Sequence, residues 1–152
     1  MERILMVCLG NICRSPLAEG VMRHKIEERG LDAEVDSAGT AAYHVGEHPD
    51  PRSIASGKSH GIDISSLRGR QFQVEDFDRF DRIYVMDKSN YANVLAMARG
   101  EDDKSKVDLL LNERNPDSFE EVPDPYWGGE QGFENVYQMI NEACDNIADK
   151  IS

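Results

Sequence analysis

A cysteine and an arginine near the start of the chain are spaced for phosphate chemistry. Residues 7–16 read VCLGNICRSP, which puts five residues between Cys8 and Arg14, Gly10 and Asn11 among them. Gly and Asn tolerate positive φ angles, so this loop can curl with its amides directed inward. Such a loop binds a tetrahedral oxyanion, and a guanidinium matches two oxygens of a phosphate. The spacing therefore predicts a phosphate-binding loop around a central sulfur.

The same surroundings favour a reactive sulfur. Inward amides, the positive end of a helix dipole and Arg14 all stabilise a thiolate at Cys8. Ser15 can donate a further hydrogen bond to that sulfur. A thiolate beneath a bound phosphorus atom is a nucleophile for phosphoryl transfer. We therefore expect Cys8 to attack and Arg14 to hold the phosphoryl group.

Thiolate attack expels an alcohol or phenol, and that leaving group needs a proton. Asp124 is the best candidate donor, since it stands between two prolines in VPDPYWGG and precedes the aromatics Tyr126 and Trp127. A carboxyl against aromatic walls retains its proton more readily. The same residue can later accept a proton from water. No step needs a metal, so we expect no cofactor.

The elements that must position these residues alternate between strands and helices. Apolar or alternating runs predict strands at 3–7, 33–37, 82–86 and 106–111. Helical spacing predicts helices from Ser15, as the cap, to Gly30, over 51–60, near 89–99, and over the last segment from Phe133 to Ile151. This order indicates an α/β fold with a four-stranded parallel sheet. The phosphate-binding loop joins the first strand to the first helix.

Ligands of open α/β sheets bind beyond the carboxyl ends of the strands. The loops that leave the four strands begin at Cys8, Ser37, Met86 and Asn112. The unusual segments CLGNICRS, SAGTAAYHVG, MDKSN and PDPYWGG lie in these loops. We therefore expect them to meet on one edge of the sheet.

The motifs VCLGNICRSP and DPYWG together resemble the low-molecular-weight protein tyrosine phosphatases, and the similarity extends through DSAGT, HGIDIS and MDKSN. It covers essentially the whole chain, so we expect residues 1–152 to form a single domain. The resemblance implies a metal-independent, two-step reaction on phosphotyrosine or small aryl phosphates through a phosphocysteine. An aromatic slot suits phosphotyrosine, whose ring lets the phosphate reach the floor, better than the shorter phosphoserine.

The resemblance also assigns roles residue by residue. The expected catalytic residues are Cys8, Arg14 and Asp124. The expected supporting residues, which shape the loop or hold Arg14, are Asn11, Ser15, Ser37 and Asp87. The expected substrate-binding positions are Leu9, Gly10, Asn11, Ile12, Cys13, Ser15, Tyr43, Tyr126 and Trp127.

Two further positions have consequences within the family. The cysteine that matches Cys13 can form a disulfide with the nucleophile under oxidants, which implies redox regulation and protection of Cys8 from over-oxidation. Many relatives have a histidine in the segment matching SSLRGRQ, where this chain has Leu67. That departure puts one supporting hydrogen bond in doubt and leaves the chemistry intact.

Composition limits the classes of partner. The 152 residues are 39% apolar and 30% charged, with a formal charge of −12. So acidic a protein lacks the basic footprint that nucleic acids or anionic membranes require. The apolar start at 4–9 is too short for a signal or a membrane span, and three cysteines do not form a disulfide framework. We expect a cytoplasmic monomer or weak dimer that acts on tyrosine-phosphorylated proteins and binds phosphate and its oxyanion analogues.

Two other classes of enzyme have the same fold and a similar loop, and both are alternatives for this chain. A thiol-dependent arsenate reductase needs further cysteines after the third strand, and residues 80–100 contain none. A phosphoarginine phosphatase has threonine where this chain has Ile12, and the bulkier apolar Ile12 favours an aryl ring. A phosphoprotein-binding module without catalysis is the weaker interpretation, because both Cys8 and Asp124 are present.

Simpler interpretations apply to other residues. Cys8, Cys13, His44 and His48 have spacings that suggest zinc, but Arg14 would be repelled by the ion. Cys144 is expected in the core. His44 and His60 are expected to be ordinary surface or cap histidines, and Arg68 and Arg70 a solvated basic patch.

Overall fold

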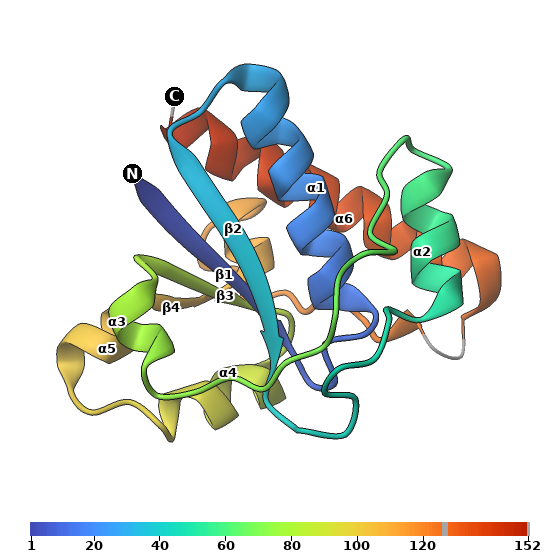
Figure 1. Cartoon of the computed structure of the whole chain (residues 1–152). Coiled ribbons are helices and arrows are strands. Elements are labelled where there is room, and N and C mark those ends of the chain that lie inside the picture. The colour runs from blue at the N-terminus through green and yellow to red at the C-terminus, as the bar shows by residue number, and fades with distance from the viewer. Residues whose placement is uncertain (126–127, 152) are drawn as a thin grey trace.

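The computed structural model describes residues 1–125 and 128–151, and its centre is a four-stranded parallel sheet (Figure 1). The strands are β1 (Glu2–Cys8), β2 (Ala33–Gly39), β3 (Arg82–Val85) and β4 (Val107–Leu109), in the order β2-β1-β3-β4. Each pair runs in parallel, with Cys8 opposite Gly39 and Val7 opposite Val85. The predicted fold class is confirmed.

Helices cover both faces of this sheet. The helices are α1 (Arg14–Arg29), α2 (Pro51–Lys58), α3 (Asp76–Arg79), α4 (Lys88–Leu95), α5 (Glu101–Ser105) and α6 (Gly129–Ile151), with a 3₁₀ turn η1 at Leu110–Glu113. Figure 1 shows α1 and α6 packed together on one face, with α2 beside α6, while α3, α4 and α5 lie on the other side. None of the helices in the described residues has the length and apolar character needed to cross a bilayer.

Side chains along β1 alternate between the two faces of the sheet. Ile4, Met6 and Cys8 join the core cluster beneath α1 and α6. Leu5 and Val7 join the second cluster, on the side of α4. Because alternate residues point to opposite faces, the Cys8 sulfur emerges at the carboxyl end of the central strand on the α1 side.

Several element boundaries differ from the sequence-based expectation. The short helices α3 and α5 were not predicted, because four or five residues are too few to show a helical hydrophobic repeat. The expected strand over 106–111 is reduced to three residues, since Leu110 and Leu111 turn into η1. Helix α4 ends at Leu95, four residues earlier than expected.

The start of α1 corrects one prediction about Ser15. The helix begins at Arg14, and its N-terminus has no side-chain cap. Ser15 lies inside the first turn and is completely buried, with its hydroxyl directed at the loop. Gly30 ends the helix as predicted, with φ of 62°.

Candidate active site

The loop between β1 and α1 curls over the Cys8 sulfur. Asn11 has φ of 56°, a left-handed conformation that Asn adopts more readily than most residues. This turn directs the Asn11 amide to the Cys8 Sγ at 3.3 Å. Cys8 is 3% exposed, so the amide and the sulfur meet in a site that is largely shielded from solvent. The Asn11 amide therefore donates directly to the sulfur that the sequence predicts to be the nucleophile.

A hydroxyl also contacts the Cys8 sulfur. Ser15 Oγ lies 3.0 Å from Cys8 Sγ. The Asn11 side-chain amide donates to Ser15 Oγ at 2.8 Å and to Ser37 Oγ at 3.0 Å. The three residues predicted to support the loop therefore form one connected network with the sulfur.

Arg14 is held in place by a partly buried ion pair. Its Nη1 donates to Asp87 Oδ2 at 2.8 Å and to the Val122 carbonyl at 2.9 Å. Asp87 is also the N-cap of α4, since its Oδ1 accepts from the Asn90 amide at 2.8 Å. Within the described residues these are the hydrogen bonds of the Arg14 guanidinium, so Nε and Nη2 keep donors for a ligand.

The loop, Arg14 and the Asp124 segment border a cavity of about 170 Å³. Its lining residues are Cys8, Leu9, Gly10, Ile12, Cys13, Arg14, Tyr43, His44 and Asp124. Asn11, Ser15 and Asp87 are not among these lining residues but bond to Cys8 or Arg14, and Ser37 bonds to Asn11. The structure thus brings together the loops that follow β1, β2, β3 and η1 at one sheet edge. Tyr126 and Trp127 lie outside the described residues.

Backbone hydrogen bonds hold these loops against each other. The Thr40 and Ala41 amides donate to the Cys8 and Leu9 carbonyls at 2.9 and 3.0 Å. The Val122 amide donates to the Met86 carbonyl at 2.8 Å, which ties the segment that contains Asp124 to the residue after β3. Asp124 itself is exposed and lines the cavity.

A glycine permits the close approach of β2 to the loop between β1 and α1. A Cβ on Gly39 would lie 2.8 Å from the Leu9 carbonyl oxygen and 3.1 Å from the Asn11 nitrogen. Both contacts are with backbone atoms, which cannot rotate away. Gly39 is therefore required for the loop to lie where it does.

Cys13 is buried and lines the cavity beside Cys8. Burial, followed by the negative charge of Asp50, raises the pKa of Cys13 to about 12. It therefore remains a thiol near neutral pH, and its carbonyl accepts from Ser53 Oγ at 2.8 Å. All three cysteines are free, and the predicted disulfide between Cys8 and Cys13 stays a prediction. Cys144 is fully buried, as expected of a core residue.

Sequence reasoning missed the roles of three residues. His44, expected to be an ordinary surface histidine, lines the cavity and pairs with Glu47 at 2.9 Å. Glu19 is buried and accepts from Ser37 Oγ at 2.6 Å, and its position four residues after Ser15 is the signal that could have found it. Arg70 was expected in a solvated patch, but it is half-buried and bonds to the loop at Asn11.

Two other expectations concern Leu67 and the histidines. Leu67 packs beside the core cluster of α1 and α6. The Asn11 Oδ1 atom accepts instead from the Arg70 backbone amide at 3.0 Å, so the loop asparagine keeps its acceptor bond.

His60 stacks on Tyr137 with ring centres 3.6 Å apart and is not among the residues that line the cavity. The described residues contain no cluster of three metal-ligating side chains.

The chain matches a known protein family over nearly its whole length. The model of the family described as "Low molecular weight phosphotyrosine protein phosphatase" matches residues 3–152. The chain belongs to this family. A protein from Synechocystis, described as a putative low molecular weight protein-tyrosine-phosphatase, is 46% identical over 147 residues, with 95% of this chain and 93% of the relative covered.

Solved structures show the same fold. The crystal structure of a protein tyrosine phosphatase from Entamoeba histolytica matches with a TM-score of 0.91 and 41% identity, covering 99% of this chain and 96% of the other. A Drosophila protein described as an arginine phosphatase matches with a TM-score of 0.90 and 35% identity, covering 99% and 97%. The low-molecular-weight phosphatase fold therefore spans essentially the whole chain.

Proposed function

We propose that this phosphatase hydrolyses phosphotyrosine in proteins, and small aryl phosphates, through a phosphocysteine on Cys8. One arrangement carries the proposal: Cys8, Arg14 and Asp124 line the same cavity. The cavity thus combines a nucleophile, a bidentate anion donor and a carboxyl group.

In the first step the Cys8 thiolate attacks phosphorus and the bond from phosphorus to the phenolic oxygen breaks. Arg14 donates to the phosphoryl oxygens, with its fork oriented by Asp87. Asp124 gives its proton to the departing phenolate, so the alcohol leaves neutral. The products are the dephosphorylated tyrosine side chain of the substrate and the phosphocysteine.

In the second step water attacks the phosphocysteine. Asp124, now a carboxylate, accepts a proton from that water. The sulfur–phosphorus bond breaks, and Cys8 leaves as a thiolate that accepts hydrogen bonds from Ser15 and the Asn11 amide. Inorganic phosphate is released and the starting state is restored.

The shape of the cavity favours an aromatic leaving group. Leu9, Ile12 and Tyr43 line it, and Leu9 and Tyr43 are exposed large apolar side chains. Apolar side chains at the rim of a charged floor suit a phenyl ring that carries a phosphate. By the family resemblance, Tyr126 and Trp127 would add to this wall.

The central test is the Cys8→Ser variant with an aryl phosphate. We expect phosphate release to fall to background, because a serine hydroxyl stays protonated near neutral pH and is a much weaker nucleophile than a thiolate. Rapid-quench measurements on the wild type should show a burst of phenol equal to the enzyme concentration. Near-normal turnover by Cys8→Ser would contradict thiolate catalysis, and the absence of phenol release by the wild type would favour a binding module.

Phosphoarginine is the second candidate substrate, because a Drosophila arginine phosphatase has the same fold. Ile12 is an apolar cavity residue, which favours the aryl substrate. Phosphotyrosine and phosphoarginine peptides should be assayed side by side for the wild type and Ile12→Thr. A wild-type preference for phosphoarginine would reverse the assignment.

The site of action and the assembly are part of the same proposal. We infer a cytoplasmic enzyme that acts as a monomer or weak dimer on tyrosine-phosphorylated proteins. The formal charge of −12 supports repulsion from anionic membranes and nucleic acids.

A further inference from the structure

The side chain of Asn11 has a fixed orientation. Its Oδ1 accepts from the Arg70 backbone amide at 3.0 Å. A backbone amide can only donate, so the atom that faces it must be the oxygen of Asn11. Both Nδ2 hydrogens then point the other way, to Ser15 Oγ at 2.8 Å and Ser37 Oγ at 3.0 Å.

This orientation also fixes the direction of the two hydroxyls. Each hydroxyl accepts from Asn11 and has one hydrogen left to donate. Ser37 donates to the buried Glu19 carboxyl at 2.6 Å. Ser15 has Cys8 Sγ at 3.0 Å and the Ala38 carbonyl at 3.5 Å, so the sulfur is the closer acceptor. The direction of the bond on the nucleophile therefore follows from the Arg70 amide.

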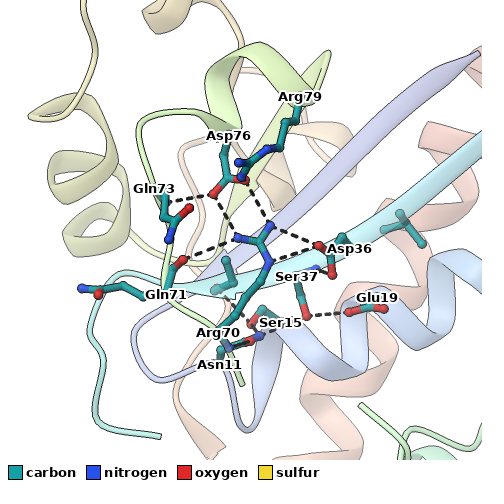
Figure 2. Close-up of polar contacts among 12 residues, drawn as sticks. Asn11, Ser15, Glu19, Asp36, Ser37, Arg70, Gln71, Gln73, Asp76 and Arg79 are labelled. Atoms are coloured by element: carbon teal, nitrogen blue, oxygen red, sulfur yellow. Dashed lines mark hydrogen bonds and ion pairs between the residues drawn. The ribbon is translucent and has the colours of Figure 1, made fainter. Parts of the chain in front are cut away.

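The Arg70 side chain anchors that amide from the opposite side. Its guanidinium lies between Asp36 and Asp76, as Figure 2 shows. Nε donates to Asp36 Oδ2 at 3.1 Å, and Nη1 and Nη2 donate to the two oxygens of Asp76 at 3.1 and 3.2 Å. Such a bidentate pair fixes the plane of the guanidinium.

Asp76 is the rigid end of this arrangement. Its side chain is completely buried, and it also accepts from the Gln73 amide at 2.9 Å and from Arg79 at 3.2 Å. The Arg70 carbonyl in turn accepts from the Gly39 amide at 2.8 Å, on the strand beside the loop. Backbone and side chain of Arg70 are thus both fixed relative to Asn11.

We propose that Arg70 is a positioning residue for this reaction: its ion pairs with Asp76 and Asp36 hold its amide on Asn11, which directs the Ser15 hydroxyl to the Cys8 sulfur. The proposal rests on the function proposed above. Arg70 is not among the residues that line the reaction cavity. Loss of the Arg70 guanidinium would leave the Asn11 side chain free to turn. The Ser15 hydroxyl would then no longer be directed at Cys8, and the thiolate would lose a hydrogen-bond donor both when it attacks phosphorus and when it leaves.

The test compares Arg70→Lys with Arg79→Lys on an aryl phosphate. Arg79 pairs with the same Asp76 but is half-exposed and, within the described residues, makes no hydrogen bond to the phosphate-binding loop, so it is a matched control. Lysine keeps the charge beside Asp76 but loses the planar fork. For Arg70→Lys we expect kcat about tenfold lower with KM within about twofold, as loss of one hydrogen bond to a charged atom implies. Arg79→Lys should keep kcat within about twofold.

A second readout distinguishes positioning from a general loss of stability. The rate of Cys8 alkylation by iodoacetate is measured against pH, with every variant folded at the assay temperature. We expect the midpoint of this profile to move to higher pH for Arg70→Lys and to stay at the wild-type value for Arg79→Lys. Unchanged profiles in both variants, or equal losses of kcat, would overturn the proposal.

A third variant covers the case in which Arg70→Lys does not fold. Asp36→Ala removes one partner of Arg70 but leaves every donor of the buried Asp76 in place, and Asp36 is half-exposed. We expect kcat to fall about threefold and the alkylation midpoint to move upward; no change would overturn the proposal. A wild type without aryl phosphatase activity would instead refute the proposed function itself.

Discussion

Asp87 holds the Arg14 guanidinium by a 2.8 Å hydrogen bond across the edge of the sheet. One carboxylate therefore has two tasks. Its Oδ2 orients Arg14, and its Oδ1 caps α4 through the Asn90 backbone amide. The side chain of Arg14 is 7% exposed and that of Asp87 22%, so the pair is shielded from much of the solvent.

Asp87→Asn should separate these two tasks. Asn is as good an N-cap as Asp, so unfolding free energy should change by less than about 1 kcal/mol. The neutral amide holds Arg14 less firmly, so we expect kcat/KM for an aryl phosphate to fall about tenfold. Steady-state kinetics and urea unfolding measure both quantities. Asp78→Asn is the control, because Asp78 forms an exposed ion pair with Arg99. This variant should leave kcat/KM unchanged.

Asp124→Ala tests the general acid. We expect kcat to fall about 100-fold or more for phenyl phosphate, whose leaving group needs the proton, and much less for para-nitrophenyl phosphate. KM should change little, because Arg14 and the loop bind the phosphate. A plot of log kcat against the pKa of the leaving phenol should become steeper in the variant. Equal losses for all phenols would exclude Asp124 as the acid.

Gly39→Ala tests the close approach between β2 and the loop. The new Cβ would meet the Leu9 carbonyl at 2.8 Å, so either the strand or the loop must move. We expect a loss of about 2 kcal/mol in unfolding free energy and at least a tenfold loss in kcat/KM. Gly100→Ala is the control, because a Cβ there meets nothing within 4 Å. Similar behaviour of both variants would show that Gly39 does not constrain the loop.

The pH dependence of stability should report the buried thiol of Cys144. Burial raises its pKa from the ordinary 9.0 to about 12. Between these values the unfolded chain has lost the proton and the folded chain has kept it, so stability falls as pH rises. The stabilisation that comes from keeping the Cys144 thiol protonated is fully present below pH 9 and is lost as the pH rises towards 12.

Cys144→Ala removes this dependence. At pH 8 we expect the variant to be about 1 kcal/mol less stable than the wild type, because a small cavity forms. Above pH 9 the difference should shrink by up to about 1.4 kcal/mol per pH unit and change sign by about pH 10.5. Urea unfolding at pH 8, 9.5 and 10.5 measures it. A constant difference would mean that the thiol does not resist ionisation in the folded protein.

The sequence by itself determined the strand–loop–helix order around Cys8 and the four parallel strands. Local spacing is sufficient for such features, because an apolar run of five residues and a helical repeat each bury one continuous surface. It also indicated Cys8, Arg14 and Asp124, whose residue types and loops are unusual. Helices of about one turn, such as α3, are too short to carry a repeat and were missed.

Only the tertiary structure decided what holds those residues in place. Asn11 meets Arg70, which is 59 positions away, and Arg14 meets Asp87, which is 73 positions away. No local pattern distinguishes a surface arginine from one whose amide orients a loop asparagine. The distinction depends on which side chains the sheet order β2-β1-β3-β4 brings together, since a hydrogen bond requires contact within about 3 Å.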